Sequence, residues 1–394
     1  MKEALEQRPR PKARRESREG MPPTIVRRED SEKRRLSRGM RDGDEYEGEA
    51  EERLKRGDAE AEERLKRGDR EAEERLRRGD REAEERFKRG DAEAEGMNFE
   101  RIRPRPRLVL GGRGTSPHQM NWPRGLCVLP PSQDGQNLFA VADSSNHRVQ
   151  IFAATDGTLI RTFGNFGSGD GQFDGCCALC VSGVRKELLV ADRYNHRVQV
   201  FDFRGTFRRK FGCQGTGSGQ FQQCWGIAVD EQFGLIYVAD KDNHRVQMFD
   251  AEGTFLTKFG SMGDGARQFN HPLYLTFYPS KRLLFVADSA NNRISVFAPD
   301  GTPLRQFGGN GSAEGQLKLP RGIVVDSRGR IIVADSGNNR VQVFSPTGTC
   351  LRVFGTWGTA SGQFKGVEGV CLLRQEQHQL VVADRENNRV QLFA

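Results

Sequence analysis

The sequence predicts an all-β fold, a closed ring of six four-stranded units, on three observations. A variant of V-A-D-x-x-N-[H/N]-R-[V/I]-Q recurs six times towards the C-terminus. The copies are spaced 47 to 49 residues apart, the length of a small antiparallel sheet. Each unit contains four β-branched and aromatic runs separated by Gly, Pro, Asn and Asp, with no helical periodicity beyond one turn. Six such units predict a six-bladed β-propeller with four antiparallel strands per blade.

The fifth copy shows the predicted blade most clearly. Its four apolar runs are Gly322–Asp326, Ile331–Ala334, Val341–Phe344 and Cys350–Phe354. Turn-forming residues lie between consecutive runs, as expected for short strands joined by tight turns. The last copy ends after three strands at Ala394, whereas an unused strand, Arg107–Gly112, precedes the first copy. We therefore expect the N-terminal strand to complete the last blade and remove a free sheet edge, in a domain spanning residues 103–394.

The acidic and basic residues of the repeated motif have two interpretations. Asp335 and Asn338 could hold their tight turn by accepting backbone N–H groups, with Arg340 pairing with Asp335 through two hydrogen bonds. Alternatively, six such residues could line a binding surface. Recurrence in every copy favours the structural interpretation. The residues concerned are Asp143, Asp192, Asp240, Asp288, Asp335 and Asp384, with Arg148, Arg197, Arg245, Arg293, Arg340 and Arg389.

The motif resembles the NHL repeat, through runs such as Asn146-His147-Arg148-Val149 and Asn195-His196-Arg197-Val198. The architecture is similar to the six-bladed NHL propeller of TRIM-NHL and Brat-type proteins. The resemblance implies a domain that binds proteins, or that binds short single-stranded or stem-loop RNA on a basic rim. Ubiquitin ligases of the TRIM family also need Cys/His zinc clusters, and no cysteine precedes Cys127 in this sequence. Ligase activity is therefore not predicted for this chain.

The region before the propeller has a different composition. Residues 1–47 form a tail that begins basic and is poor in apolar residues, which predicts disorder. Residues 48–96 contain charged 11-residue repeats, which could form a helical spacer, remain disordered, or self-associate as a weak coiled coil. The Arg-Gly-Asp triplets there recur only because the whole repeat recurs. No signal-peptide core or membrane-length apolar run is visible, so we expect a cytoplasmic protein, with the nucleus as the alternative, and reduced cysteines.

Three features could carry chemistry, and each has a structural explanation. The Cys177–Cys180 spacing falls on a predicted inner strand, where small core residues are expected. His147, His196 and His244 occupy equivalent turns of separate blades, too far apart to share a metal ion. The glycines follow the blade period. We expect no metal, no cofactor and no enzyme activity; a lyase- or lactonase-like propeller enzyme is one of the alternatives.

Variation among the repeats indicates where a partner binds. Just before the inner strand the copies carry Arg124, Cys176, Trp225, Leu273, Arg321 and Glu368. The following turn adds Arg193, Tyr194 and Lys241. Residues 100–394 contain 34 Lys and Arg against 25 Asp and Glu. The sequence therefore predicts a monomeric protein-interaction scaffold, with RNA binding as the alternative, through the rim residues Arg124, Arg193, Tyr194, Trp225, Lys241 and Arg321.

Overall fold

The computed structural model describes residues 105–132, 134–373 and 379–394. The predicted tail (1–47), the predicted spacer (48–96) and residues 103 and 104 of the predicted domain lie outside the described residues, so those expectations stay predictions.

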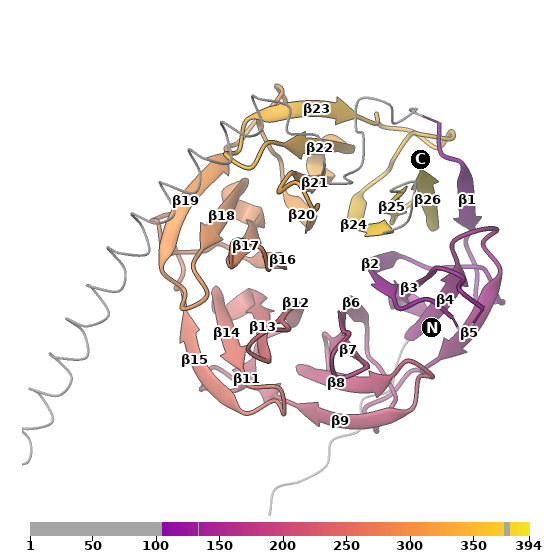
Figure 1. The fold of residues 1–394 in the computed structure, drawn as a ribbon, viewed down its shortest axis with the longest axis horizontal. Helices are drawn as coiled ribbons and strands as arrows, with labels where there is room; N and C mark the ends of the chain where they lie inside the picture. The colour runs from indigo at the N-terminus through magenta and orange to yellow at the C-terminus, as the bar shows by residue number, and fades with distance from the viewer. Residues whose placement is uncertain (1–104, 133, 374–378) are drawn as a thin grey trace, which may run out of the picture. The chain divides into compact units, whose positions relative to one another are not determined.

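Six four-stranded antiparallel sheets form a ring around a central channel, which confirms the predicted propeller (Figure 1). Strands a to d run from the channel outwards in each blade. Blade 1 contains β2 (Pro123–Leu129), β3 (Leu138–Asp143), β4 (Arg148–Ala153) and β5 (Leu159–Phe163). Blade 2 contains β6 (Cys176–Ser182), β7 (Glu187–Asp192), β8 (Arg197–Asp202) and β9 (Phe207–Phe211). Blade 3 contains β12 (Cys224–Asp230), β13 (Leu235–Asp240), β14 (Arg245–Phe249) and β15 (Phe255–Phe259).

The remaining blades repeat this order. Blade 4 contains β16 (Pro272–Tyr278), β17 (Leu283–Asp288), β18 (Arg293–Phe297) and β19 (Pro303–Gly308). Blade 5 contains β20 (Pro320–Val325), β21 (Ile331–Asp335), β22 (Arg340–Phe344) and β23 (Cys350–Phe354). Blade 6 contains β24 (Val367–Leu373), β25 (Gln379–Asp384), β26 (Arg389–Phe393) and β1 (Leu108–Gly111). A short parallel pair, β10 (Cys213–Gln214) and β11 (Gln220–Phe221), joins blades 2 and 3. Four b–c turns are single 3₁₀ turns: η2 (Ser144–Asn146), η3 (Lys241–Asn243), η4 (Ser289–Asn291) and η5 (Ser336–Asn338).

The ring closes through the N-terminal strand, as predicted. β1 pairs antiparallel with β26, with Leu108 opposite Leu392 and Leu110 opposite Val390. Leu108 and Leu110 pack against the core between blades 6 and 1. The first and last described strands therefore complete one sheet, and the edge of β26 is covered.

The repeated motif fastens each blade to the d–a loop before it. Asp335 Oδ2 accepts hydrogen bonds from Arg340 Nε (2.7 Å) and Asn338 Nδ2 (2.9 Å), and Oδ1 accepts from Lys318 N (2.7 Å). The Nη atoms of Arg340 donate to carbonyl oxygens of that loop, including Ser312 O. The scaffold interpretation therefore fits the geometry. However, Arg340 gives the aspartate one hydrogen bond, not two. The backbone N–H that the aspartate accepts belongs to Lys318 of the preceding loop, whereas within its own turn it bonds the Asn338 side chain. The same Arg–Asp pair occurs in all six copies.

The variable His or Asn of the motif links neighbouring blades. Each adopts a left-handed conformation, as with His147 at φ +53°. His147 Nδ1 accepts a hydrogen bond from Gly175 N of the next blade (3.1 Å), and Asn339 Oδ1 accepts one from Gly366 N (2.8 Å). Equivalent bonds join the other blades. The position tolerates both residues because each offers one acceptor at this place and Asn adopts the left-handed region readily. The three histidines are therefore turn residues.

Replacing Asp335 with Ala should destabilise the protein by about 3–5 kcal/mol, because it leaves the Arg340 guanidinium without its buried carboxylate. Urea unfolding of the full chain measures this loss. The exposed Asp156, in the c–d turn of blade 1, provides a control: its carboxylate accepts hydrogen bonds from Thr155 and Thr158 of its own exposed turn, and its alanine variant should unfold much closer to the wild type than Asp335→Ala does. Equal unfolding midpoints for the two variants would contradict the scaffold role of the motif.

Candidate functional site

The site lies where the channel meets the face that carries the d–a loops and b–c turns, which we call the upper face. The second residue of each inner strand lines this end of the channel. Cys176 pairs with Asp192 as Pro123 pairs with Asp143, so Cys177, not the predicted Cys176, is equivalent to Arg124. The six equivalent residues are Arg124, Cys177, Trp225, Leu273, Arg321 and Glu368.

Glu368 is the centre of this end of the channel. It is fully buried, and three guanidinium groups converge on its carboxylate. Arg321 Nη1 lies 2.9 Å from both carboxylate oxygens, Arg124 Nη1 lies 3.0 Å from Oε1, and Arg385 Nη1 lies 3.4 Å from Oε2. Burial alone would raise the pKa of Glu368, but these three arginines lower it to about 2. Glu368 is therefore ionised at neutral pH, and Arg124 and Arg321 are ion-paired side chains within β2 and β20.

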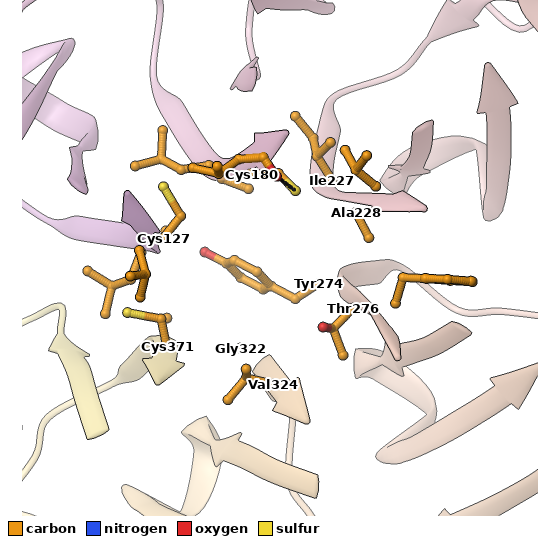
Figure 2. Close-up of a pocket in the computed structure, with 18 of the residues that line it drawn as sticks. Cys127, Cys180, Ile227, Ala228, Tyr274, Thr276, Gly322, Val324 and Cys371 are labelled. Atoms are coloured by element: carbon orange, nitrogen blue, oxygen red, sulfur yellow. Dashed lines mark hydrogen bonds between the residues drawn. The ribbon is translucent and has the colours of Figure 1, made fainter. Parts of the chain in front are cut away.

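Tyr274 crosses the channel immediately below this cluster. The equivalent residues of the other blades are Gly125, Ala178, Gly226, Gly322 and Gly369. A Cβ atom on Gly322 would lie 2.4 Å from Glu368 O of the next strand, so the neighbouring strand leaves no room for a side chain at Gly322. Tyr274 instead extends into the channel (Figure 2). Its hydroxyl donates to Cys177 O (3.2 Å) on the opposite side and lies 3.5 Å from Glu368 Oε1.

Tyr274 and the Glu368 cluster therefore separate two parts of the channel. Below them, a cavity of about 510 Å³ is lined mainly by apolar inner-strand residues and reaches the a–b turns at Pro130, Gly183 and Pro279. The face with the a–b and c–d turns is called the lower face. Above them lies the upper face with its charged and aromatic residues.

Arg193 lies against two aromatic rings on the upper face. Its guanidinium carbon lies 4.2 Å from the centre of the Tyr194 ring and 4.6 Å from that of Trp225. Its Nε donates to Gln223 Oε1 (2.9 Å). Trp225 itself is only 3% exposed, with Arg124 and Lys241 also near its ring. Trp225 therefore supports cations, and the open ring face expected for a stacked base is not available on it.

Five cations surround this end of the channel: Arg124, Arg193, Lys241, Arg321 and Arg385. Three carboxylates lie among them: Glu368, Asp242, which pairs with Lys241 (2.7 Å), and Glu386, which pairs with Arg385 (2.7 Å). The group, which we call the channel mouth, therefore carries two positive charges in excess. Within the described part of the chain, Arg193 is the only one of the five cations without a carboxylate at salt-bridge distance.

Large apolar side chains are also exposed on the loops and turns of the upper face. Phe166 and Trp357 are 66% and 67% exposed, and Trp122 is 42% exposed beside Arg124 and Arg385. Tyr194, Met262 and Leu319 are also exposed. All six lie on d–a loops or b–c turns of the upper face. These residues and the bonds in the repeated motif show a rigid loop framework that presents apolar and cationic groups on one face.

The structure thus places all six predicted rim residues at one end of the channel. Arg193, Tyr194 and Trp225 are in direct contact, and Lys241 lies beside Trp225. Arg124 and Arg321 meet instead at Glu368. Sequence reasoning did not select Trp122, Arg385, Phe166, Met262 or Trp357 as site residues, and it noted Glu368 without assigning it a role. Tyr274 was also missed, although a tyrosine at a position that is glycine in four of the six copies is a visible signal.

The described ranges contain no cluster of three or more His, Cys, Asp or Glu arranged to hold a metal ion. Cys177 and Cys180 lie on β6 and neither forms a disulfide. Burial raises the pKa of the Cys177 thiol to about 12, although the nearby Arg193 and Arg124 act to lower it. The thiol therefore stays protonated at neutral pH. No helix in the part of the chain that the structure describes is long and apolar enough to cross a membrane.

Comparison with known families agrees with this geometry. The NHL repeat model matches residues 120–152 and 317–344, and a 6-bladed beta-propeller model matches residues 179–256. RING finger protein nhl-1 of Caenorhabditis elegans is 44% identical over 92 residues, which are 23% of this chain and 9% of that protein. The chain contains NHL repeats in a six-bladed β-propeller. The matched region spans less than a tenth of the length of this relative.

Solved structures share the fold at low sequence identity. A Bacteroides thetaiotaomicron protein of unknown function aligns with a TM-score of 0.55 at 15% identity, covering 73% of this chain and 76% of its own. A streptogramin B lyase aligns with a TM-score of 0.50 at 14% identity, covering 73% and 86%. At these identities the likeness shows the propeller fold alone.

Proposed function

We propose that the chain is a non-catalytic interaction scaffold whose upper face binds a protein or peptide. The observation that carries this proposal is that six exposed large apolar side chains lie on the loops and turns of one face: Trp122, Phe166, Tyr194, Met262, Leu319 and Trp357. Binding residues lie disproportionately on loops that a rigid scaffold holds in place. Tryptophan, tyrosine and arginine also dominate the energetically important positions of protein interfaces.

The rigidity of the upper face supports the same proposal. Each d–a loop is fixed by the Asp, Asn and Arg of the next motif, and each blade is bonded to its neighbour through the His or Asn position. Binding to such a face costs little ordering entropy, because loops and side chains are already held in place. The NHL repeats of the chain are consistent with this role.

Changing both Trp122 and Phe166 to Ala should weaken peptide binding by more than about tenfold, because exposed aromatic anchors each contribute more than about 1 kcal/mol. The ligands are displayed random peptides selected on the full chain, and their affinities are measured for each variant. The matched control replaces Val184 and Phe233, which are 74% and 55% exposed on the lower face, with Ala. Equal losses from the two double variants, or a loss only from the control, would reject the upper face as the binding surface.

RNA binding is the second candidate, favoured by the excess of Lys and Arg over Asp and Glu in residues 100–394 and by the exposed rings of Tyr194 and Trp122. In that case a random single-stranded RNA pool should bind the full chain in a salt-dependent manner. Loss of one phosphate contact should reduce the log–log salt slope by about 0.7. Arg193→Ala should show this reduction, whereas Arg161→Ala on the outer strand β5 should not. Salt slopes that change equally in both variants would indicate diffuse attraction.

A further inference from the structure

We propose that the channel mouth receives the carboxylate of one Asp or Glu side chain of the protein partner, bound by the Arg193 guanidinium. This inference rests on the proposed function, because it names the chemistry by which the upper face recognises its ligand. The side chains of the described residues hold the Arg193 guanidinium in place but provide no carboxylate to neutralise it.

The contacts of Arg193 leave its two Nη groups placed to bind an anion. Arg193 follows β7, and its guanidinium carbon lies 4.2 Å from the centre of the Tyr194 ring and 4.6 Å from that of the Trp225 ring. Its Nε is occupied by Gln223 Oε1. In the described part of the chain, neither Nη atom forms a hydrogen bond with another residue. The two ring contacts and the Nε hydrogen bond restrain the guanidinium, so its two Nη groups form a preorganised donor pair of the kind that binds carboxylates.

The charge of the channel mouth also favours an anion at Arg193. Lys241 is neutralised by Asp242, Arg385 has Glu386, and Arg124 and Arg321 share Glu368 with Arg385. Arg193 alone lacks such a partner among these five cations. It stacks on the buried ring of Trp225, where an ion pair is stronger than in open water. One additional negative charge at Arg193 would therefore be favourable.

The surroundings favour a single carboxylate of a polypeptide over a polyanion. Asp242 and Glu386 already pair with Lys241 and Arg385, so a chain with one charge per nucleotide would meet only one cation of the channel mouth that lacks a carboxylate partner. The exposed Tyr194 and Trp122 instead offer apolar contacts to residues on either side of an acidic side chain. The structure thus fits an acidic residue flanked by apolar residues.

A double-mutant cycle on the full chain tests this inference. Displayed random peptides are selected on the wild type, and each selected peptide is compared with a variant in which its Asp or Glu is changed to Asn or Gln. On the wild type, we expect the amide peptide to bind roughly 10- to 100-fold more weakly. On Arg193→Gln, we expect the two peptides to bind equally. Arg161→Gln, which removes an exposed arginine from β5, should keep the wild-type difference. The thermal unfolding midpoint of Arg193→Gln is compared with that of the wild type to check that the variant is folded.

The outcomes separate this inference from the proposed function. Peptides that bind the upper face without a shared acidic residue, or an amide penalty of equal size on Arg193→Gln, would overturn the inference and leave the scaffold function intact. Failure to select any peptide would overturn both. Binding of a random RNA pool that depends on Arg193, with no acidic peptide selected, would assign the site to phosphate and overturn the carboxylate proposal.

Discussion

A chain lacking residues 1–112 is expected to lose its cooperative unfolding transition, whereas a chain lacking residues 1–99 keeps it. The longer deletion removes β1, whose four residues pair with β26 and whose Leu108 and Leu110 cover the core between blades 6 and 1. Because every blade depends on its neighbours, opening the ring at this edge should cost an amount comparable to the total stability of a domain, about 5–15 kcal/mol.

Thermal unfolding of the two truncated chains measures this effect. The shorter deletion is the matched control, because both remove the same charged N-terminal region and only one removes β1. Similar thermal midpoints for the two chains would contradict closure of the ring by the N-terminal strand.

The Glu368→Gln variant should unfold with a free energy about 3–5 kcal/mol lower than that of the wild type. Glutamine keeps the shape of the side chain but removes the one buried carboxylate on which Arg124, Arg321 and Arg385 converge, and unpaired buried charges are costly. Glu386→Gln is the matched control. It removes the partly exposed partner of Arg385 alone and should cost less than about 1 kcal/mol. Urea unfolding at neutral pH that gave equal losses for both variants would refute the central role of Glu368.

The wild type and the Glu368→Gln variant should differ in how their stability changes as the pH falls. The folded-state pKa of Glu368, at about 2, lies below the unfolded value of about 4.5. Ionised Glu368 therefore contributes stability that is fully present above pH 4.5 and is lost as pH falls towards 2. A shift of this size corresponds to about 3 kcal/mol. The stability difference between wild type and Glu368→Gln should shrink across this interval.

The sequence predicted the architecture well, because the fold is determined by features that recur locally. Six motif copies at a constant spacing define the blades, and the unpaired strand before the first copy identifies the closing strand. The scaffold role of the motif was also accessible, since Asp335 and Arg340 are only five residues apart. The loop that the motif holds could not be predicted, because the carbonyl oxygens of Ser312 and Ala313 that Arg340 bonds belong to the loop leaving the preceding blade.

The candidate site was only partly predictable. A comparison of equivalent positions selected Arg193, Tyr194, Trp225 and Lys241, which do lie together. It could not show that Arg124 meets Glu368, 244 residues away in the sequence, or that Trp225 is buried beneath Arg193. Exposure and pairing depend on how closely the inner strands approach, and this approach is set by packing of the whole ring. Tyr274 is the exception, because its departure from glycine is visible in the aligned repeats.

Oxidative footprinting of the full chain with a selected peptide bound tests the central claim most directly. The claim is that the upper face is the binding surface. We predict protection of Trp122, Phe166 and Trp357 on that face, with Val184 and Phe233 on the lower face labelled as in the free protein. Protection of Val184 and Phe233, with the three upper-face residues unchanged, would contradict the account.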